Sequence, residues 1–599
     1  MMPRILARAE NLGLVIALAI MTLLPLAEIA LRAAFQVGVS GAAAFTQNLA
    51  LVAGMLGAVI AAREGRLLSL STLPSLLPAP ASALARQFTG IVSAAIAALL
   101  FVASCDFVAA ERDGGNVIAY GVPVWLMAAA LPAGFALLSV RLAVDAAASW
   151  QGRVAALLAA LATGLAAASG LALNDTLVIA LLGVLLLAAV LGSPVFATLG
   201  GFALILFWGE GLPIASIPLD HYRLVVNPSL PMIPLFTLAG YFLAEGGAPR
   251  RLVRVCNALL GGLRGGAALV TVVASVFFTS FSGASGVTII ALGGMLMPLL
   301  IGSGYSGKAA LGLLTSAGSL GGLLPPGLPL VLYAIIARVS IEEMFLAGLL
   351  PGLLMVGLVA IWGWRQAPAC VERRRFDAAE ARAALWDAKW ELALPVVAFA
   401  GLFGGVATPV EAAAVTAVYA FVVETIVHRD LDLRRDVPRV MVQAGLLVGG
   451  ILLILGVALG LTNYLVDARI PERAVDWVTG TVHSRWVFLL LLNLFLLVAG
   501  CFLDIFSATV VLVPILLPLA AAFGIDPVHL GIIFLANLEL GYLTPPVGMN
   551  LFFAAYRFGK PLPEVFRAVL PPLCVLAGGV LLVTFVPWLT TAMTKGGSS

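Results

Sequence analysis

Apolar runs of roughly membrane-spanning length recur along the whole 599-residue chain and leave little room for any other kind of fold. Hydrophobic residues make up 62% of the sequence and charged residues only 11%, which is too little charge to cover the surface of a soluble protein of this size. The pattern predicts an all-α polytopic membrane protein embedded in a lipid bilayer.

The sequence gives no indication of an enzyme, a metal centre held by cysteine and histidine, or a nucleic-acid-binding protein. Its net charge is only +3, and its five cysteines and four histidines are scattered without paired spacing. The stretch GSGYSGKA, residues 302–309, nearly matches the phosphate-binding loop GxxxxGK[ST], but Ala309 has no hydroxyl for magnesium. We therefore expect neither ATP binding nor catalysis, and interpret Lys308 as an anchor at the cytoplasmic edge.

The first part of the chain predicts four membrane helices and a fifth that connects to the rest. The runs are 12–31, 44–62, 88–110, 122–144 and 154–173. Arginines lie before the first helix, after the second and around the end of the fourth, so that every other connection is basic: Arg4, Arg8, Arg63, Arg66, Arg141 and Arg153. Because basic residues favour the cytoplasm, the amino terminus is predicted inside, and the first helix is interpreted as an uncleaved span. The Pro-broken segment 66–82 is predicted to be an interfacial helix.

The later basic clusters predict two re-entrant hairpins. Further spans are expected near 177–192, 194–209 and 230–245, and basic clusters follow at 250–264, 365–389, 428–439 and 557–567. All four clusters can face the cytoplasm only if the segments 265–303 and 484–524 enter and leave the membrane on the same side. The first hairpin would open inward and the second outward, and the carboxyl terminus would be periplasmic.

An internal repeat supports this interpretation. Positions 220 apart carry the same residue at Pro298 and Pro518, at Gly304 and Gly524, at Gly321 and Gly541, and at Leu323 and Leu543. The same offset superimposes Pro325-Pro326 on Pro545-Pro546. Two halves with opposite entry sides are typical of an inverted-repeat secondary transporter.

Each half carries a double proline inside an apolar segment, in GSLGGLLPPGLP (318–329) and in ELGYLTPPVGMNLFF (539–553). Proline has no N–H and clashes with the preceding turn, so both helices must break. Freed carbonyls in hydrocarbon need a partner, and together with a helix carboxyl end they favour a cation. Each break is expected to face a polar hairpin tip, FTSFSGASGVT (278–288) or GCFLDIFSAT (500–509). The alternative is that both prolines merely kink their helices.

Four polar residues in or beside membrane segments need an explanation. Asp504 is a functional candidate because a carboxylate in a membrane segment is costly, although it could instead cap a helix. For Glu539 and Asn537, the sequence favours a packing role and a role in a binding site equally. Glu411, which follows a proline at a helix start, is predicted to be a cap near the surface.

These residues resemble the large membrane subunit of tripartite ATP-independent periplasmic (TRAP) transporters. The likeness covers about 174–599 and includes GIDPVHLGIIFLANLELGYLTPPVGMNLFF, FLDIFSAT, SGASGVT, GSLGGLLPPGLPLVLYA and ATPVEAAA. Residues 1–150 resemble the small four-helix subunit more weakly, through EIALR, REGRLL and PVWLMAAALPAGFALL, and 151–173 would be the connecting helix. The chain departs from the usual pattern at Gly327, Val410 and Leu67-Leu68, which stand for a serine, a threonine and a frequent histidine.

The resemblance implies an elevator-type transporter of the bacterial inner membrane, with sodium-driven uptake of organic acids delivered by a periplasmic substrate-binding protein. The large part would move its hairpin-bearing domain against a scaffold enlarged by the small part. Two or more coupling Na⁺ ions are expected. One sodium site would involve Ser282 and Gly283 at the first tip and the break from Gly321 to Pro325. The other would involve Asp504, Thr544 and Val547, the last two through carbonyl groups. Candidates for substrate contact are Ser285, Thr288, Ser507 and Asn550.

Two other functions stay open. A stand-alone sodium–carboxylate symporter of the same architecture would need no binding protein, but the four-helix unit at the amino end disfavours it. A membrane-embedded enzyme would need a nucleophile or metal set facing a cavity, and the sequence offers none.

Overall fold

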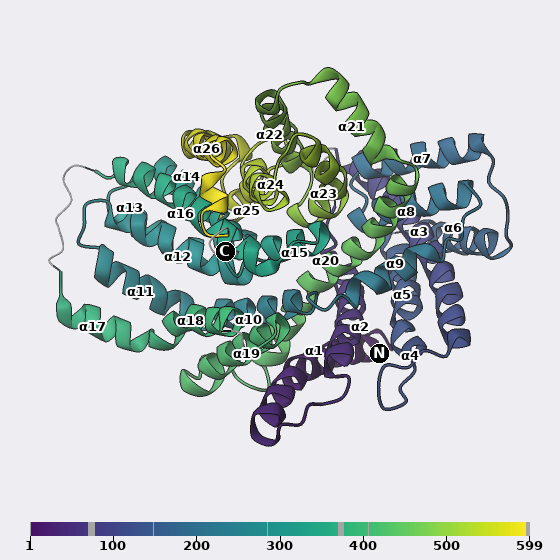
Figure 1. Cartoon of the computed structure of the whole chain (residues 1–599), viewed down its shortest axis with the longest axis horizontal. Helices are drawn as coiled ribbons and strands as arrows, with labels where there is room; N and C mark the ends of the chain where they lie inside the picture. The colour runs from purple at the N-terminus through teal and green to yellow at the C-terminus, as the bar shows by residue number, and fades with distance from the viewer. Residues whose placement is uncertain are drawn as a thin grey trace. The chain divides into compact units, whose positions relative to one another are not determined.

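The computed structural model describes residues 2–69, 78–147, 149–283, 285–368, 376–404 and 407–594 (Figure 1). Among these residues all regular secondary structure is helical, apart from two isolated β-bridge pairs. Twelve of these helices are long and apolar enough to cross a membrane, or up to 13 spans if a bent pair is counted as one. The prediction of an all-α polytopic membrane fold is therefore confirmed. Residues 70–77 of the predicted interfacial segment at 66–82 lie outside the described residues, as does Cys370, and residues 79–82 form the start of α3 (Ala79–Gly114).

The chain forms two compact units, each assembled from segments that are distant in sequence. Unit 1 contains Met1–Pro234, Met441–Pro471 and Val510–Leu512, and unit 2 contains Leu235–Val440, Glu472–Thr509 and Val513–Ser599.

Small residues hold the first helices of unit 1 together. These helices are α1 (Met2–Phe35), α2 (Ala42–Arg63), α3 (Ala79–Gly114), α4 (Val124–Ala128), α5 (Ala130–Asp145) and α6 (Trp150–Ala168). One alanine core joins α3, α5 and α6 through Ala94, Ala98, Ala143, Ala146, Ala156 and Ala160. The unit continues with α7 (Asp175–Val190), α8 (Val195–Gly209) and α9 (Ser216–Val225). Close backbone approach through small side chains is a usual way to pack membrane helices.

A buried carboxylate joins arginines that the sequence assigns to one side of the membrane. Glu10 is 4% exposed, and its Oε2 accepts a 3.0 Å hydrogen bond from Nη1 of Arg63. Its other carboxylate oxygen accepts from Arg141. Glu10 of α1 therefore meets the end of α2 and an arginine of α5 at one place, as the assignment of these arginines to one side requires. Which side that is stays a prediction.

Unit 2 contains the predicted repeat, with Val510–Leu512 of one helix counted in unit 1. Five consecutive helices have counterparts that begin 219 to 221 positions further along. The first copy is α12 (Gly266–Ser282), α13 (Ser285–Gly302), α14 (Gly307–Ala317), α15 (Leu328–Ala337) and α16 (Ile341–Arg365). The second copy is α22 (Arg485–Phe502), α23 (Ile505–Ala522), α24 (Pro527–Gly541), α25 (Met549–Phe558) and α26 (Leu562–Phe585). The bond between the two prolines is cis in both copies.

Each copy begins with two helices that turn back on each other. In the first, the Tyr305 hydroxyl just after α13 donates to the Gly363 carbonyl at 3.1 Å, and Ala268 near the start of α12 packs on the same glycine. In the second, the ring of Phe488 near the start of α22 stacks on Phe523, just after α23, with centroids 4.2 Å apart. The segments 265–303 and 484–524 are thus helix–turn–helix units, and their re-entry from one membrane side stays a prediction.

The remaining elements precede, separate or follow the two copies along the chain. They are α10 (Met232–Glu245), α11 (Ala248–Leu260), the 3₁₀ helix η2 (Leu320–Leu323), α17 (Ala378–Asp387), α18 (Lys389–Phe403), α19 (Pro409–Val422), the π-helix η3 (Val423–Val427), α20 (Asp436–Asp467), α21 (Ile470–Thr481) and α27 (Trp588–Thr591). Thr408 and Glu411 form a reciprocal capping box at the start of α19, so Glu411 is a cap as predicted, although its side chain is buried.

Candidate functional site

The first double proline breaks a helix and leaves carbonyl groups without donors. Residues 307–323 and α15 are bent by 41° at the break. The helical partners of the Gly322 carbonyl would be the N–H groups of Pro325 and Pro326, which do not exist. Among the described residues, no hydrogen bond reaches the carbonyl oxygens of Gly322 and Leu323. Both prolines are buried, so water does not replace the missing donors freely.

The first hairpin tip packs against this break. Thr279 Oγ1 lies 2.8 Å from the Gly318 carbonyl oxygen and 2.8 Å from Thr288 Oγ1. A Cβ at Gly321 would lie 2.5 Å from Ser280 N, so only glycine permits this approach. Ser282 is buried and its hydroxyl has no partner in the described part of the chain, while Gly283 turns the chain with φ 64°. The structure thus brings Gly321 next to the end of α12 that carries Ser282 and Gly283.

The second break lacks backbone donors for the same reason as the first, but its environment is different. Pro545 and Pro546 cannot donate to the carbonyls of Tyr542 and Leu543. Tyr542 O accepts from Asn550 N at 3.1 Å instead, and no hydrogen bond reaches Leu543 O among the described residues. Both prolines are exposed, unlike their counterparts in the first copy.

Two residues predicted to act through carbonyl groups lie at this second break. The Thr544 hydroxyl donates to Leu540 O at 2.8 Å, and among the described residues no hydrogen bond reaches the Thr544 carbonyl oxygen. Val547, half-buried, has only its carbonyl to offer.

Asp504 caps the second helix of the second hairpin. It is 8% exposed, and its Oδ1 accepts from the backbone N–H groups of Phe506 at 3.0 Å and Ser507 at 3.1 Å. Its Oδ2 accepts from the Ser507 hydroxyl. The cap that the sequence left open is therefore present. A carboxylate has about four acceptor positions, so a cap does not exhaust it, and its role as a sodium ligand stays a prediction.

Backbone contacts join this tip to the second break. The Ile505 N–H donates to the Tyr542 hydroxyl at 2.6 Å, and the Gly548 N–H donates to Cys501 O at 3.4 Å. The tip that carries Asp504 therefore contacts the second break, and the two together form one polar cluster.

The four residues proposed for substrate contact divide into separate groups. Ser285 donates to Asn550 Oδ1 at 2.6 Å, and the buried Nδ2 of Asn550 has no partner within the described ranges. Thr288 pairs with Thr279, and Ser507 is held by Asp504. The structure brings together only Ser285 and Asn550, which joins the first tip to the half-helix after the second break.

Glu539 and Asn537, which the sequence left undecided, have different environments. Asn537 Nδ2 donates to Asn493 Oδ1 at 2.8 Å, and that oxygen also accepts from Thr584, so Asn537 belongs to a packing network. Glu539 is buried beside Gly322, and no residue that the structure describes makes a hydrogen bond to its carboxylate. Its signal in the sequence was an acid one helical turn before the second break.

Sequence reasoning missed a charged cluster around Arg251 of α11. Its guanidinium donates to Glu391 of α18, to Glu424 of η3 at 3.0 Å and to Asp430 at 2.6 Å. Both glutamate side chains are 0% exposed. Burial would raise the pKa of the Asp430 carboxyl, but the hydrogen bond and charge of Arg251 outweigh it and lower the pKa below its ordinary value. The cluster ties segments near 250, 391 and 430, which the sequence assigns to one membrane side.

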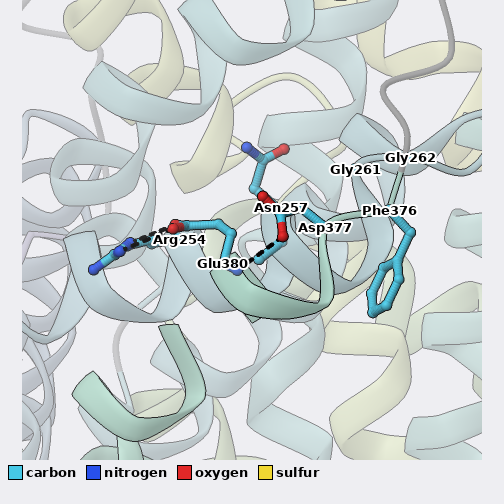
Figure 2. Close-up of a pocket in the computed structure, with 8 residues that line it drawn as sticks. Arg254, Asn257, Gly261, Gly262, Phe376, Asp377 and Glu380 are labelled. Atoms are coloured by element: carbon cyan, nitrogen blue, oxygen red, sulfur yellow. Dashed lines mark hydrogen bonds and ion pairs between the residues drawn. The ribbon is translucent and has the colours of Figure 1, made fainter. Parts of the chain in front are cut away.

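A surface groove of about 350 Å³ lies between α11 and α17, and Figure 2 shows its lining: Arg254, Asn257, Gly261, Gly262, Phe376, Asp377 and Glu380. Arg254 Nε donates to Glu380 Oε1 at 2.8 Å, and Asp377 caps α17. None of the residues predicted to bind sodium or substrate lines this groove.

Two sequence profiles match the chain in tandem. The profile described as "Tripartite ATP-independent periplasmic transporters, DctQ component" matches residues 21–152. The profile described as "Tripartite ATP-independent periplasmic transporter, DctM component" matches residues 154–589.

Individual relatives agree with these profiles. The "C4-dicarboxylate TRAP transporter large permease protein DctM" of Pseudomonas aeruginosa is 36% identical over 400 residues, covering 66% of this chain and 92% of the relative. The "Isethionate TRAP transporter permease protein DctMQ" of Oleidesulfovibrio alaskensis is 33% identical over 486 residues, covering 78% of this chain and 74% of the relative. The solved structure of the Alcanivorax borkumensis YdaH transporter matches with TM-score 0.43 and 18% identity, covering 60% of this chain and 85% of that one. That likeness is too distant to carry an argument about the site.

Proposed function

Because the chain belongs to the tripartite ATP-independent periplasmic transporter family and joins its DctQ and DctM components in one polypeptide, we propose that it imports a small organic acid across the inner membrane. A periplasmic substrate-binding protein would deliver the acid, and sodium entry would drive the transport.

The names of relatives support the substrate class. They include permeases for C4-dicarboxylates, for isethionate and for ectoine or 5-hydroxyectoine. These compounds are small and carry carboxylate or sulfonate groups. Ser285 and the unpaired amide of Asn550 are the proposed contacts, because Nδ2 of Asn550 is a buried donor free to meet such an anion.

The observation that carries the sodium proposal is the pair of proline breaks. Each removes two backbone donors, and Asp504 adds a carboxylate to the cluster at the second break. Hard cations prefer oxygen ligands of these kinds. The proposed ligands are Ser282, Gly283, Gly321 and Pro325 at the first break, and Asp504, Thr544 and Val547 at the second. During transport the hairpins would move like an elevator against the remaining helices.

We expect uptake to require the binding protein. Purified chain in proteoliposomes with an inward sodium gradient should take up labelled substrate only when loaded binding protein is present outside, and added ATP should have no effect. Uptake of free substrate at the same rate without binding protein would instead favour a stand-alone symporter.

The proposed orientation places the amino terminus in the cytoplasm, the carboxyl terminus in the periplasm, and Arg434 on the cytoplasmic side with the Arg251 cluster. A single cysteine at position 434 of a cysteine-free variant should react with a membrane-impermeant maleimide only after the cells are opened. Labelling of intact spheroplasts at this position would overturn both the orientation and the inverted-repeat interpretation.

A further inference from the structure

Glu539 of α24 is a buried carboxylate that has no opposite charge or hydrogen-bond donor among the residues that the structure describes. It is 4% exposed, and neither of its carboxylate oxygens has a hydrogen-bond partner among the described residues. A carboxylate in this position needs a proton, a donor or a cation. No ion pair in the described part of the chain involves it.

The first break comes directly against this carboxylate. A Cβ at Gly322 would lie 2.4 Å from Glu539 Oε1, so the acid occupies space that only a glycine leaves open. Gly322 is also the residue whose carbonyl loses both helical donors to Pro325 and Pro326. The carboxylate therefore lies beside the residue with the freed carbonyl, and among the described residues no hydrogen bond reaches either group.

The repeat shows that packing alone does not demand an acid here. The position 220 residues before Glu539 is Ser319, which follows α14 and whose hydroxyl donates to Ser316 O near the end of that helix, 3.1 Å away. The first copy thus fills the equivalent place with a small, satisfied side chain. The second copy pays for a buried carboxylate that makes no recorded hydrogen bond.

We propose that Glu539 and the carbonyl of Gly322 hold a further sodium ion, in addition to the ion proposed at Ser282, Gly283, Gly321 and Pro325 of the same break and the ion proposed at the second break. This inference rests on the proposed sodium-driven function. Oxygen ligands from a carboxylate and a helix carboxyl end suit a hard monovalent cation. Because Glu539 comes from the second copy of the repeat and Gly322 from the first, ligands from both copies would coordinate the ion and link the two copies.

Sodium-dependent thermal stability of the purified chain tests this without measuring transport. A ligand that binds the folded state raises the melting temperature with its concentration. Melting would be followed in detergent as NaCl replaces choline chloride at constant ionic strength, for wild type, Glu539→Gln and Glu343→Gln. Glu343 is an exposed glutamate outside every proposed sodium or substrate site, and it serves as the matched control. Glu539→Asp, which keeps the charge on a shorter side chain, guards against a glutamine variant that folds poorly.

We expect wild type and Glu343→Gln to be stabilised by sodium along one curve. Glu539→Gln should need at least about tenfold more sodium for the same increase, and Glu539→Asp should lie between them. If Glu539→Gln follows the wild-type curve, the carboxyl carries its own proton and the inference is wrong, while sodium-driven uptake still stands. If sodium does not stabilise wild type at all, sodium binding itself is refuted and both proposals fail together.

Discussion

Replacing Asp504 by asparagine should raise the sodium concentration for half-maximal uptake at least about tenfold, which corresponds to about 1.4 kcal/mol of lost cation affinity. Asp504 supplies the formal negative charge at a cluster where proline has freed backbone carbonyls. Removing that charge weakens attraction for a cation in a low-dielectric site. The measurement is the initial uptake rate in proteoliposomes against sodium concentration, with saturating loaded binding protein.

The structure explains why asparagine at position 504 removes the negative charge but keeps the helix cap. Asparagine keeps the Oδ1 that accepts from Phe506 N and Ser507 N, and the Ser507 hydroxyl can turn to accept from the new amide. Alanine loses the cap as well, which costs about 1 kcal/mol of stability. Asp504→Asn should therefore melt near the wild-type temperature, and Asp504→Ala should melt lower.

Two controls bracket this result. Thr544→Ala should change the sodium curve little, because the Thr544 hydroxyl is already bonded to Leu540 O and its carbonyl survives. Lys308→Ala should leave the dependence of uptake on sodium concentration unchanged, since Lys308 is exposed at the start of α14. An unchanged sodium curve for Asp504→Asn would show that Asp504 is only a cap.

The breaks and the repeat could be predicted from the sequence because they depend on local chemistry. A missing N–H in Pro325 or Pro545 removes a helical bond wherever the helix lies. The offset of 220 likewise carried over to helix boundaries, as with Ser285 and Ile505 at the starts of α13 and α23. The cap by Glu411 followed from its position after Thr408 and Pro409.

Partners supplied by distant segments could not be predicted in the same way. The four residues of the Arg251 cluster lie as far apart as positions 251 and 430, so no spacing rule connects them. The two double prolines are identical in sequence, yet Pro325 is buried and Pro545 is exposed, because tertiary cover differs. Whether Glu539 was a packing or a site residue depended on Gly322, more than 200 positions away.

Replacing Arg251 by alanine should be the most destabilising single change in the charged part of unit 2. It leaves Glu391 and Glu424, both fully buried, without the guanidinium that offsets their desolvation. Removing one partner of a buried ion pair costs about 3–5 kcal/mol. We expect a large drop in the melting temperature of the purified chain and a low yield of folded protein. Neutralising the two carboxylates as well, by Glu391→Gln and Glu424→Gln, should restore part of the loss.

Arg254, one helical turn away, provides the matched control. Its guanidinium is 45% exposed and pairs with the exposed acids Glu380 and Asp387. Exposed ion pairs contribute little to stability, so Arg254→Ala should melt close to wild type. An equal effect of the two substitutions would contradict the distinction drawn from burial.

The pH dependence of the Arg251 variant gives an independent check. Arg251 holds the pKa of Asp430 below 3.8, its ordinary value, so this pair stabilises the folded chain fully above that value. The contribution disappears as pH falls through the lowered folded pKa, because Asp430 then becomes protonated. Arg251→Ala lacks the contribution at every pH. The difference in melting temperature between wild type and Arg251→Ala should therefore be widest near neutral pH and narrow in acid, whereas a purely steric role for Arg251 would keep it constant.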